Sequence, residues 1–158
     1  MSYPVSTVPA VFTYLLATLT TAFAGATNPT DIYLCMGDPG EQAPPDIIEI
    51  TGVQRTTPHF AMVGDGETEA QEEIYQVMFR VSSAMRGDTQ ATIAPLVQAR
   101  AWYLLGLIET AVRTDPSLGG IVLTAWPGQS NGGVPVWSAN GNGMICEIES
   151  SIEVENVF

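Results

Sequence analysis

The chain of 158 residues carries 17 aspartates and glutamates against five arginines and no lysine, so its formal net charge at pH 7 is −12. That charge repels nucleic-acid phosphates and excludes a basic binding surface, and a chain without lysine cannot form the phosphate-binding loop that ends in Gly-Lys. Apolar residues make up 46% of the chain, which predicts one folded domain over residues 1–158 with a single modest core.

The first helix is predicted directly after Thr7, with Pro9 in its early turn, a position that helices tolerate. Its apolar residues recur at helical spacing, and Gly25 followed by Asn28-Pro29 ends it. The apolar positions are Val8, Val11, Phe12, Leu15, Leu16, Leu19 and Phe23.

The same stretch raises the alternatives of a signal peptide or a membrane span, because Asp31 is the first charged residue of the chain. A signal peptide requires a basic segment at its start, and none exists here. Several threonines and Pro9 make the stretch a poor span. We therefore favour a buried helix and no membrane contact. An Ala-x-Ala-like site at residues 22–24 leaves a cleaved, secreted protein as an alternative.

Three strands are predicted next, at residues 32–35, 46–53 and 72–83. The third is the clearest, because an apolar face alternates with a polar one. Its apolar face holds Tyr75, Val77, Phe79 and Val81, and its polar face holds Gln76, Arg80 and Ser82. Residues 54–71 are expected to form a loop, and a loop of that length is either functional or mobile.

The second helix is predicted from Thr92 to Thr114, with Thr92 as its cap, Pro95 in its first turn and Asp115-Pro116 ending it. One broad apolar stripe runs along it and should face the core. The stripe consists of Ile93, Leu96, Val97, Ala101, Leu104, Leu105, Ile108, Ala111 and Val112.

A strand at 121–125, a short strand at 134–138 and a last strand at 144–157 complete the chain. The Asn-Gly sequences at 131–133 and 140–143 are interpreted as hairpin turns. The order is helix-strand-strand-strand-helix-strand-(short strand)-strand. It predicts an α+β fold, in which two main helices pack on one face of a mostly antiparallel sheet.

The sequence contains few patterns typical of catalytic or metal-binding sites. His59 is the only histidine and is interpreted as a surface side chain, so a hydrolase is a distant alternative. Gly64-Asp65-Gly66-Glu67 lacks the oxygen alternation of a calcium loop, and Glu67–Glu69 and Glu72-Glu73 are interpreted as solvated. We expect no catalytic residues, metal or cofactor. Cys35 and Cys146 are expected to be buried thiols, although one disulfide is possible if their strands are neighbours.

The last strand has an unusual pattern, in which glutamates alternate with apolar residues. If the strand is unbroken, Cys146, Ile148, Ser150, Ile152 and Val154 share one face. The other face carries Glu147, Glu149, Ser151, Glu153 and Glu155. Two interpretations remain open: an ordinary half-exposed strand, or a functional acidic wall.

Two segments resemble the tail terminator (tail-completion) proteins of long-tailed bacteriophages. The first is Ala99-Arg100-Ala101-Trp102-Tyr103-Leu104-Leu105-Gly106-Leu107-Ile108-Glu109, and the second is Asp115-Pro116-Ser117-Leu118-Gly119-Gly120-Ile121-Val122. The terminal strand of alternating isoleucine and glutamate adds to the likeness, as does the element order along nearly the whole chain. Asp115, Pro116, Leu118, Gly119 and Gly120 form its most specific motif.

The resemblance implies a non-enzymatic virion protein, assembled in the host cytoplasm and located in the virion tail. It implies a homo-oligomeric ring, generally hexameric, that caps the head-proximal end of the tail tube. Such a ring stops tube polymerisation, contacts the tube protein and the head-completion or neck protein, and lets DNA pass without specific binding. Glu147, Glu149, Glu153 and Glu155 are then candidates for the wall of the lumen. A tail tube subunit or another neck protein of related fold is the first alternative, and a secreted binding module with a cleaved N-terminus is the second.

Overall fold

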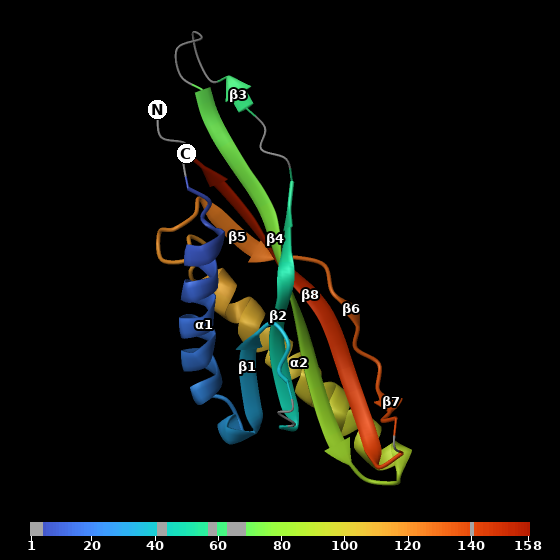
Figure 1. Ribbon diagram of the computed structural model, residues 1–158. Coiled ribbons are helices and arrows are strands. Elements are labelled where there is room, and N and C mark those ends of the chain that lie inside the picture. Colours follow the sequence, from blue (N-terminus) through green and yellow to red (C-terminus); the bar gives the residue numbers. More distant parts are fainter. Residues whose placement is uncertain (1–4, 41–43, 57–59, 63–68, 140) are drawn as a thin grey trace.

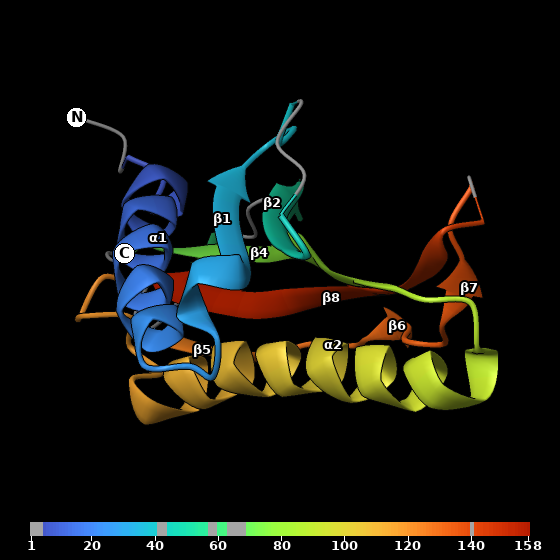
Figure 2. The same cartoon turned by 90° about the horizontal axis from the view of Figure 1, so that it is seen from below.

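The computed structural model describes residues 5–40, 44–56, 60–62, 69–139 and 141–158. It has the expected α+β architecture, with two helices packed on one face of a twisted sheet (Figure 1). Seen from below, α2 runs along β8, while α1 stands at one end of the molecule beside β1 (Figure 2).

The elements follow the predicted order, with two additional short strands. The helices are α1 (Val8–Ala24), a short 3-10 helix (Pro29–Asp31) and α2 (Gln90–Thr114). The strands are β1 (Ile32–Met36), β2 (Asp46–Arg55), β3 (Phe60–Met62), β4 (Glu69–Arg86), β5 (Thr124–Pro127), β6 (Asn131–Gly132), β7 (Val136–Trp137) and β8 (Gly143–Val157).

The main path of the sheet is β1-β2-β4-β8-β5, with β3 on β4 and both β6 and β7 on β8. Only β1 and β2 pair in parallel among the described strands; the other pairs are antiparallel. The longest pairing joins β4 to β8, from Glu72 opposite Val157 to Arg86 opposite Gly143. These two long strands therefore form the centre of the sheet.

The core lies between the helices and one face of this sheet. Both predicted helical stripes point into it, because residues three and four apart share a helix face. The buried positions of α1 are Val11, Leu15, Leu19 and Phe23; those of α2 are Ile93, Val97, Ala101, Leu104, Leu105, Ile108 and Val112. Leu96, assigned to the stripe from the sequence, is 53% exposed, so that assignment was wrong. Helix α2 is long and apolar enough to cross a membrane, as judged by length and composition alone. One third of its most apolar segment is buried inside the fold.

Several predicted boundaries shift. β2 continues to Arg55, and β3 pairs antiparallel with β4, so residues 54–55, 60–62 and 69–71 of the expected loop are strand. Helix α2 begins at Gln90 after Thr89, which places Pro95 inside the helix and not in its first turn. The strand expected at 121–125 starts only at Thr124. His59 and the Gly64–Glu67 turn lie outside the described residues.

Glu73 is a buried carboxylate at the start of α1, whereas the sequence had suggested a solvated one. Its side chain is 1% exposed and accepts hydrogen bonds from the Ser6 hydroxyl and from the Thr7 backbone N–H at 3.1 Å. The hydroxyls of Thr7 and Tyr75 lie 2.9 Å apart in the same cluster, where burial raises the pKa of Tyr75 to about 12. A carboxylate at a helix N-terminus is favoured by the helix dipole. Glu73 therefore anchors α1 to the sheet from β4.

A second buried carboxylate, Asp46, holds the opposite end of the helical layer. It is 3% exposed, accepts a 2.7 Å hydrogen bond from the Ser83 hydroxyl and pairs with Nε of Arg100 on α2 at 2.9 Å. The same guanidinium donates to the backbone oxygen of Asn28, which follows α1. One arginine thus joins α2 to β2 and to the segment between α1 and β1.

The turn after α2 explains why Asp115 and its neighbours form a distinctive motif. The Asp115 carboxylate accepts hydrogen bonds from the Tyr14 hydroxyl of α1 at 2.7 Å, from the Ser117 hydroxyl at 2.8 Å and from the Gly119 N–H at 2.8 Å. These bonds, the one from Tyr14 foremost, lower the pKa of Asp115. Leu118 is fully buried at a positive φ of 49°, and Gly119 and Gly120 follow at 72° and 81°. The motif is therefore a structural turn that fastens α2 to α1.

Replacement of a buried leucine tests the placement of α2. Leu104 is 0% exposed, so Leu104→Ala should lower the free energy of unfolding by about 2–5 kcal/mol through lost burial and a residual cavity. Leu96→Ala on the same helix is the matched control and should stay within about 0.5 kcal/mol of the parent chain. Denaturant unfolding measures both, and equal effects at the two positions would contradict the assigned buried face.

The Asp115 turn predicts a pH-dependent stability. A carboxylate whose folded pKa lies below its ordinary value of 3.8 stabilises the fold above that pH, and this contribution is lost as the pH falls through the lowered pKa. Asp115→Asn should therefore melt below the parent chain at pH 7, and the difference should shrink below about pH 4.

Tyr14→Phe is the companion variant, since it removes the strongest of the three donors. It should move the pKa of Asp115 back towards its ordinary value, as read by NMR titration of the carboxyl carbon. A melting difference for Asp115→Asn that stays constant across the acidic range would show that the carboxylate charge is not what stabilises the turn.

Candidate functional site

The sheet face away from the helices is the candidate functional surface, and we call it the open face. The alternation along β4 creates it: Tyr75, Val77, Phe79 and Val81 are buried, while Gln76, Met78, Arg80 and Ser82 are half-buried or exposed. Cross-strand partners share a face, so the register of β4 with β2 and β8 decides which side chains meet there. This alternation agrees with the one expected from the sequence.

The four candidate glutamates all lie on the open face of β8. Glu147 and Glu149 are exposed, and Glu153 and Glu155 are half-buried, while Cys146, Ile148, Ile152 and Val154 point into the core. Ser151 lies between the two glutamate pairs and is 9% exposed. We call Glu147, Glu149, Glu153 and Glu155 the acidic strip. The structure brings these four residues together on one strand, as the alternation predicted.

The middle of the acidic strip is balanced by one arginine. Arg80 on β4 pairs with Glu49 on β2 at 2.6 Å and with Glu149 on β8 at 3.3 Å, so a carboxylate lies on either side of it. Its Nε is buried and has no hydrogen-bond partner among the described atoms. Because two carboxylates flank one guanidinium, this three-strand row carries net negative charge.

The remaining glutamates of the strip have different surroundings. Glu153 accepts a 2.9 Å hydrogen bond from the side-chain amide of Gln76 on β4. Within the described ranges, no arginine pairs with Glu147 or Glu155. Glu147 lines a hollow of about 520 Å³ together with Asp38, Glu49 and Arg80. The strip is therefore acidic along its length and least compensated at its two ends.

Arg80, Glu49 and Gln76 belong to this surface, although the sequence interpretation named only the residues of β8. The alternation of β4 had placed Gln76 and Arg80 on its polar face. The sequence does not reveal the register between strands, and Arg80 lies beside Glu149 only because of the particular pairing of β4 with β8. The Asp115 turn contacts α1 on the helical side and takes no part in the open face.

The two cysteines are too far apart to form the disulfide that the sequence left open. Cys35 on β1 and Cys146 on β8 are both free, and β2 and β4 lie between their strands. Neighbouring strands are about 4.8 Å apart, so three spacings exceed the reach of a disulfide. Cys146 is buried as expected, but Cys35 is only half-buried. Burial raises the pKa of both thiols.

The expected turn at 131–133 is also different. Asn131 and Gly132 pair with β8 as β6, and the Gly133 oxygen accepts hydrogen bonds from Trp102 at 3.2 Å and Gln98 at 3.0 Å. A Cβ on Gly133 would lie 2.4 Å from the Trp102 ring. The segment is therefore a strand-edge contact with α2, and not a hairpin turn. β7 and β8, which lie on either side of the second Asn-Gly segment, pair antiparallel, while Asn140 lies outside the described residues.

In the part of the chain that the structure describes, no three His, Cys, Asp or Glu side chains are grouped so that they could hold a metal ion. What the site offers is a negatively charged surface on one face of the β-sheet. No protein-family model matches the chain, and a comparison with curated proteins finds no match.

Proposed function

We propose that this chain is a non-enzymatic structural protein of a long-tailed bacteriophage, a ring-forming tail terminator. In this role it caps the head-proximal end of the tail tube, stops tube polymerisation and joins the tail to the head-completion proteins. The observation that carries the proposal is the open face: one side of the sheet is backed by helices, and the other presents the acidic strip.

An acidic open face suits a channel through which DNA must pass. Double-stranded DNA carries one negative charge per about 1.7 Å of its axis, so arginines and lysines along a channel would hold it at many points. Carboxylates repel it evenly, over a distance of about 8 Å at physiological salt. Arg80, the cation beside the middle of the strip, is already paired with Glu49 and Glu149. A ring of such subunits, generally hexameric in the family that the sequence resembles, would present a continuous acidic wall.

The main path of the sheet ends at β1 and β5, and no other described strand pairs with the outer edge of either. Unpaired strand edges favour association with a second chain, and closed rings are a common way to satisfy them. The partners in this proposal are further copies of the chain, the tail tube protein on one side and a head-completion or neck protein on the other. DNA passes through without specific binding, and the chain takes no cofactor.

The structure bears differently on the two alternatives. A tail tube subunit of related fold would use the same open face, so it stays the first alternative. A secreted module cleaved after Ala24 would lose Val11, Leu15, Leu19 and Phe23, which are 0–4% exposed in the core. Removal of this segment deprives the fold of one of its two long helices and of these core side chains, which argues against the secreted alternative.

Electron microscopy of particles made with and without this protein separates the terminator from the tube subunit. Without a terminator, tube polymerisation should continue and give overlong tubes, whereas particles without a tube subunit should lack tubes. In complete particles, density for the chain should form one ring at the head-proximal end of the tail. A chain found as a monomer and bound nowhere on the tail would contradict the proposal.

Charge reversal of the acidic strip tests whether it lines the lumen of the ring. Replacing Glu147, Glu149, Glu153 and Glu155 together by lysine should slow genome release in correctly assembled particles, because the lumen would then attract phosphates. Glu147→Lys with Glu155→Lys is the gentler variant, because these two glutamates form no ion pair within the described ranges. The matched control replaces the same residues by glutamine. Unchanged release for the lysine variants would show that the strip does not line the DNA path.

A further inference from the structure

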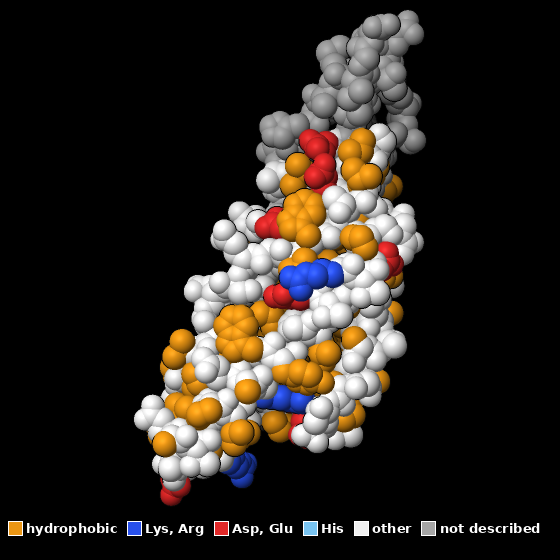
Figure 3. Space-filling view, turned by 180° about the vertical axis from the view of Figure 1, so that it is seen from behind, with side chains coloured by type: hydrophobic (Ala, Val, Ile, Leu, Met, Phe, Trp, Pro, Cys, Tyr) orange, Lys and Arg blue, Asp and Glu red, His pale blue; other side chains and the backbone are white. Residues whose placement is uncertain are grey.

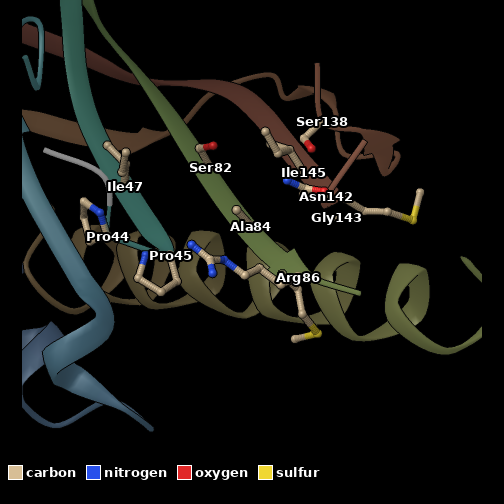
Figure 4. A pocket seen from close by; sticks show the side chains of 12 residues that line it. Pro44, Pro45, Ile47, Ser82, Ala84, Arg86, Ser138, Asn142, Gly143 and Ile145 are labelled. Carbon is tan, nitrogen blue, oxygen red and sulfur yellow. The ribbon is translucent and has the colours of Figure 1, made fainter. Parts of the chain in front are cut away.

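A hollow lies at the end of the open face where β8 begins. Its volume is about 960 Å³, and β2, β4, β7–β8 and the segment before β2 all contribute to it. Figure 4 shows Ser82, Ala84 and Ile145 on the strands, with Pro44 and Pro45 on one side and Asn142 and Gly143 on the other. We call it the β8-start hollow.

The lining of this hollow is mostly apolar. Two prolines, two isoleucines, two methionines and one alanine contribute: Pro44, Pro45, Ile47, Ile145, Met85, Met144 and Ala84. Methionine side chains adapt to the shape of a partner, and apolar lining with a few polar groups is typical of binding sites. Gly143 forms one wall at a φ of 153°, where a Cβ would collide with the Met85 backbone. The wall is therefore closely packed.

The charge of the hollow is opposite to that of the rest of the chain. No aspartate or glutamate lines it within the described residues, although the chain holds 17 of them. Arg86 is its one charged residue there, and Figure 4 shows its side chain extending from the end of β4 towards the β2 side. Four of the five arginines form ion pairs; Arg86 pairs with no carboxylate in the described ranges. An exposed arginine beside apolar side chains is suited to bind a carboxylate in two-point geometry.

We propose that the β8-start hollow binds a segment of a partner protein in which a carboxylate side chain lies next to aliphatic residues. The aliphatic side chains fill the space over Ile47, Ala84 and Ile145, and the carboxylate pairs with Arg86. Charge complementarity favours an acidic segment, because Arg86 is the arginine that pairs with no carboxylate within the described ranges. The proposal concerns a single subunit and does not depend on ring formation.

NMR of the full chain with labelled isoleucine and methionine methyl groups tests the binding. The probes are two capped peptides, acetyl-Gly-Leu-Glu-Leu-Gly-amide and the same peptide with glutamine in place of glutamate. The glutamate peptide should shift the methyl signals of Ile47, Met85 and Ile145 saturably, while Met78, outside the hollow, stays unchanged. The glutamine peptide should bind about fivefold more weakly, as expected for loss of one partly exposed ion pair.

Variants of the chain test whether Arg86 contacts the carboxylate of the peptide and whether the peptide lies in the hollow. Arg86→Gln should abolish the difference between the two peptides, Arg86→Lys should keep part of it, and Ala84→Trp should block both peptides by filling the hollow. Arg113→Gln is the matched control, because Arg113 lies on α2 in a pair with Glu109 and should leave both affinities unchanged. The comparison of peptides on the parent chain needs no variant, so it holds even if one variant fails to fold.

Three results would overturn the proposal. Equal affinity for the two peptides would exclude recognition of the carboxylate. Absence of saturable shifts at Ile47 and Ile145, or shifts spread over the whole open face, would exclude the hollow as the site. Inorganic phosphate that produced the same methyl shifts as the glutamate peptide would indicate a general anion site in place of a peptide site.

Discussion

The pairing of β4 with β8 is the interaction on which the rest of this structure depends. These strands pair along their length, and every other described strand except β1, which pairs with β2, is hydrogen-bonded to one of them. Because side chains alternate between the two faces of a strand, a slip of one residue would move a whole row to the other side. It would bury Glu147, Glu149, Glu153 and Glu155 under the helices and expose Ile148, Ile152 and Val154. One register thus determines both the apolar core and the acidic open face.

Two buried carboxylates attach the helical layer to the sheet at its opposite ends. Glu73 accepts hydrogen bonds at the start of α1, and Asp46 pairs with Arg100 of α2. A buried charge is costly unless it is paired and hydrogen-bonded, so removal of a partner destabilises more than the contact itself contributes. A chain with so few cations therefore commits one of its five arginines to the inside of the fold. Because Arg100 is paired with the buried Asp46, this pair is neutral and leaves the net charge of the surface unchanged.

Much of the fold was predictable because it depends on local periodicity. The α1 stripe, most of the α2 stripe and the alternation along β4 and β8 all follow from residue spacing, and the acidic strip followed with them. The failures concern contacts between distant segments. The sequence indicated a solvated Glu73, but in the structure the start of α1 covers this carboxylate. The sequence also indicated a turn at Gly133, but in the structure this glycine packs against the Trp102 ring. The ion pairs of Arg80 with Glu49 and Glu149 could not be predicted either, because they depend on the register of β2, β4 and β8.

The parallel pairing of β1 with β2 sets the directions in which the two sheet edges run. Along the path β1-β2-β4-β8-β5, strands β1, β2 and β8 point one way, and β4 and β5 point the other way. In a ring whose axis runs along the strands, rotation preserves direction, so β1 of one copy would meet β5 of the next with opposite polarity. That joint is antiparallel, the slightly more stable arrangement, over the four or five residues that these short edges offer. With β1 reversed, the same joint would be parallel.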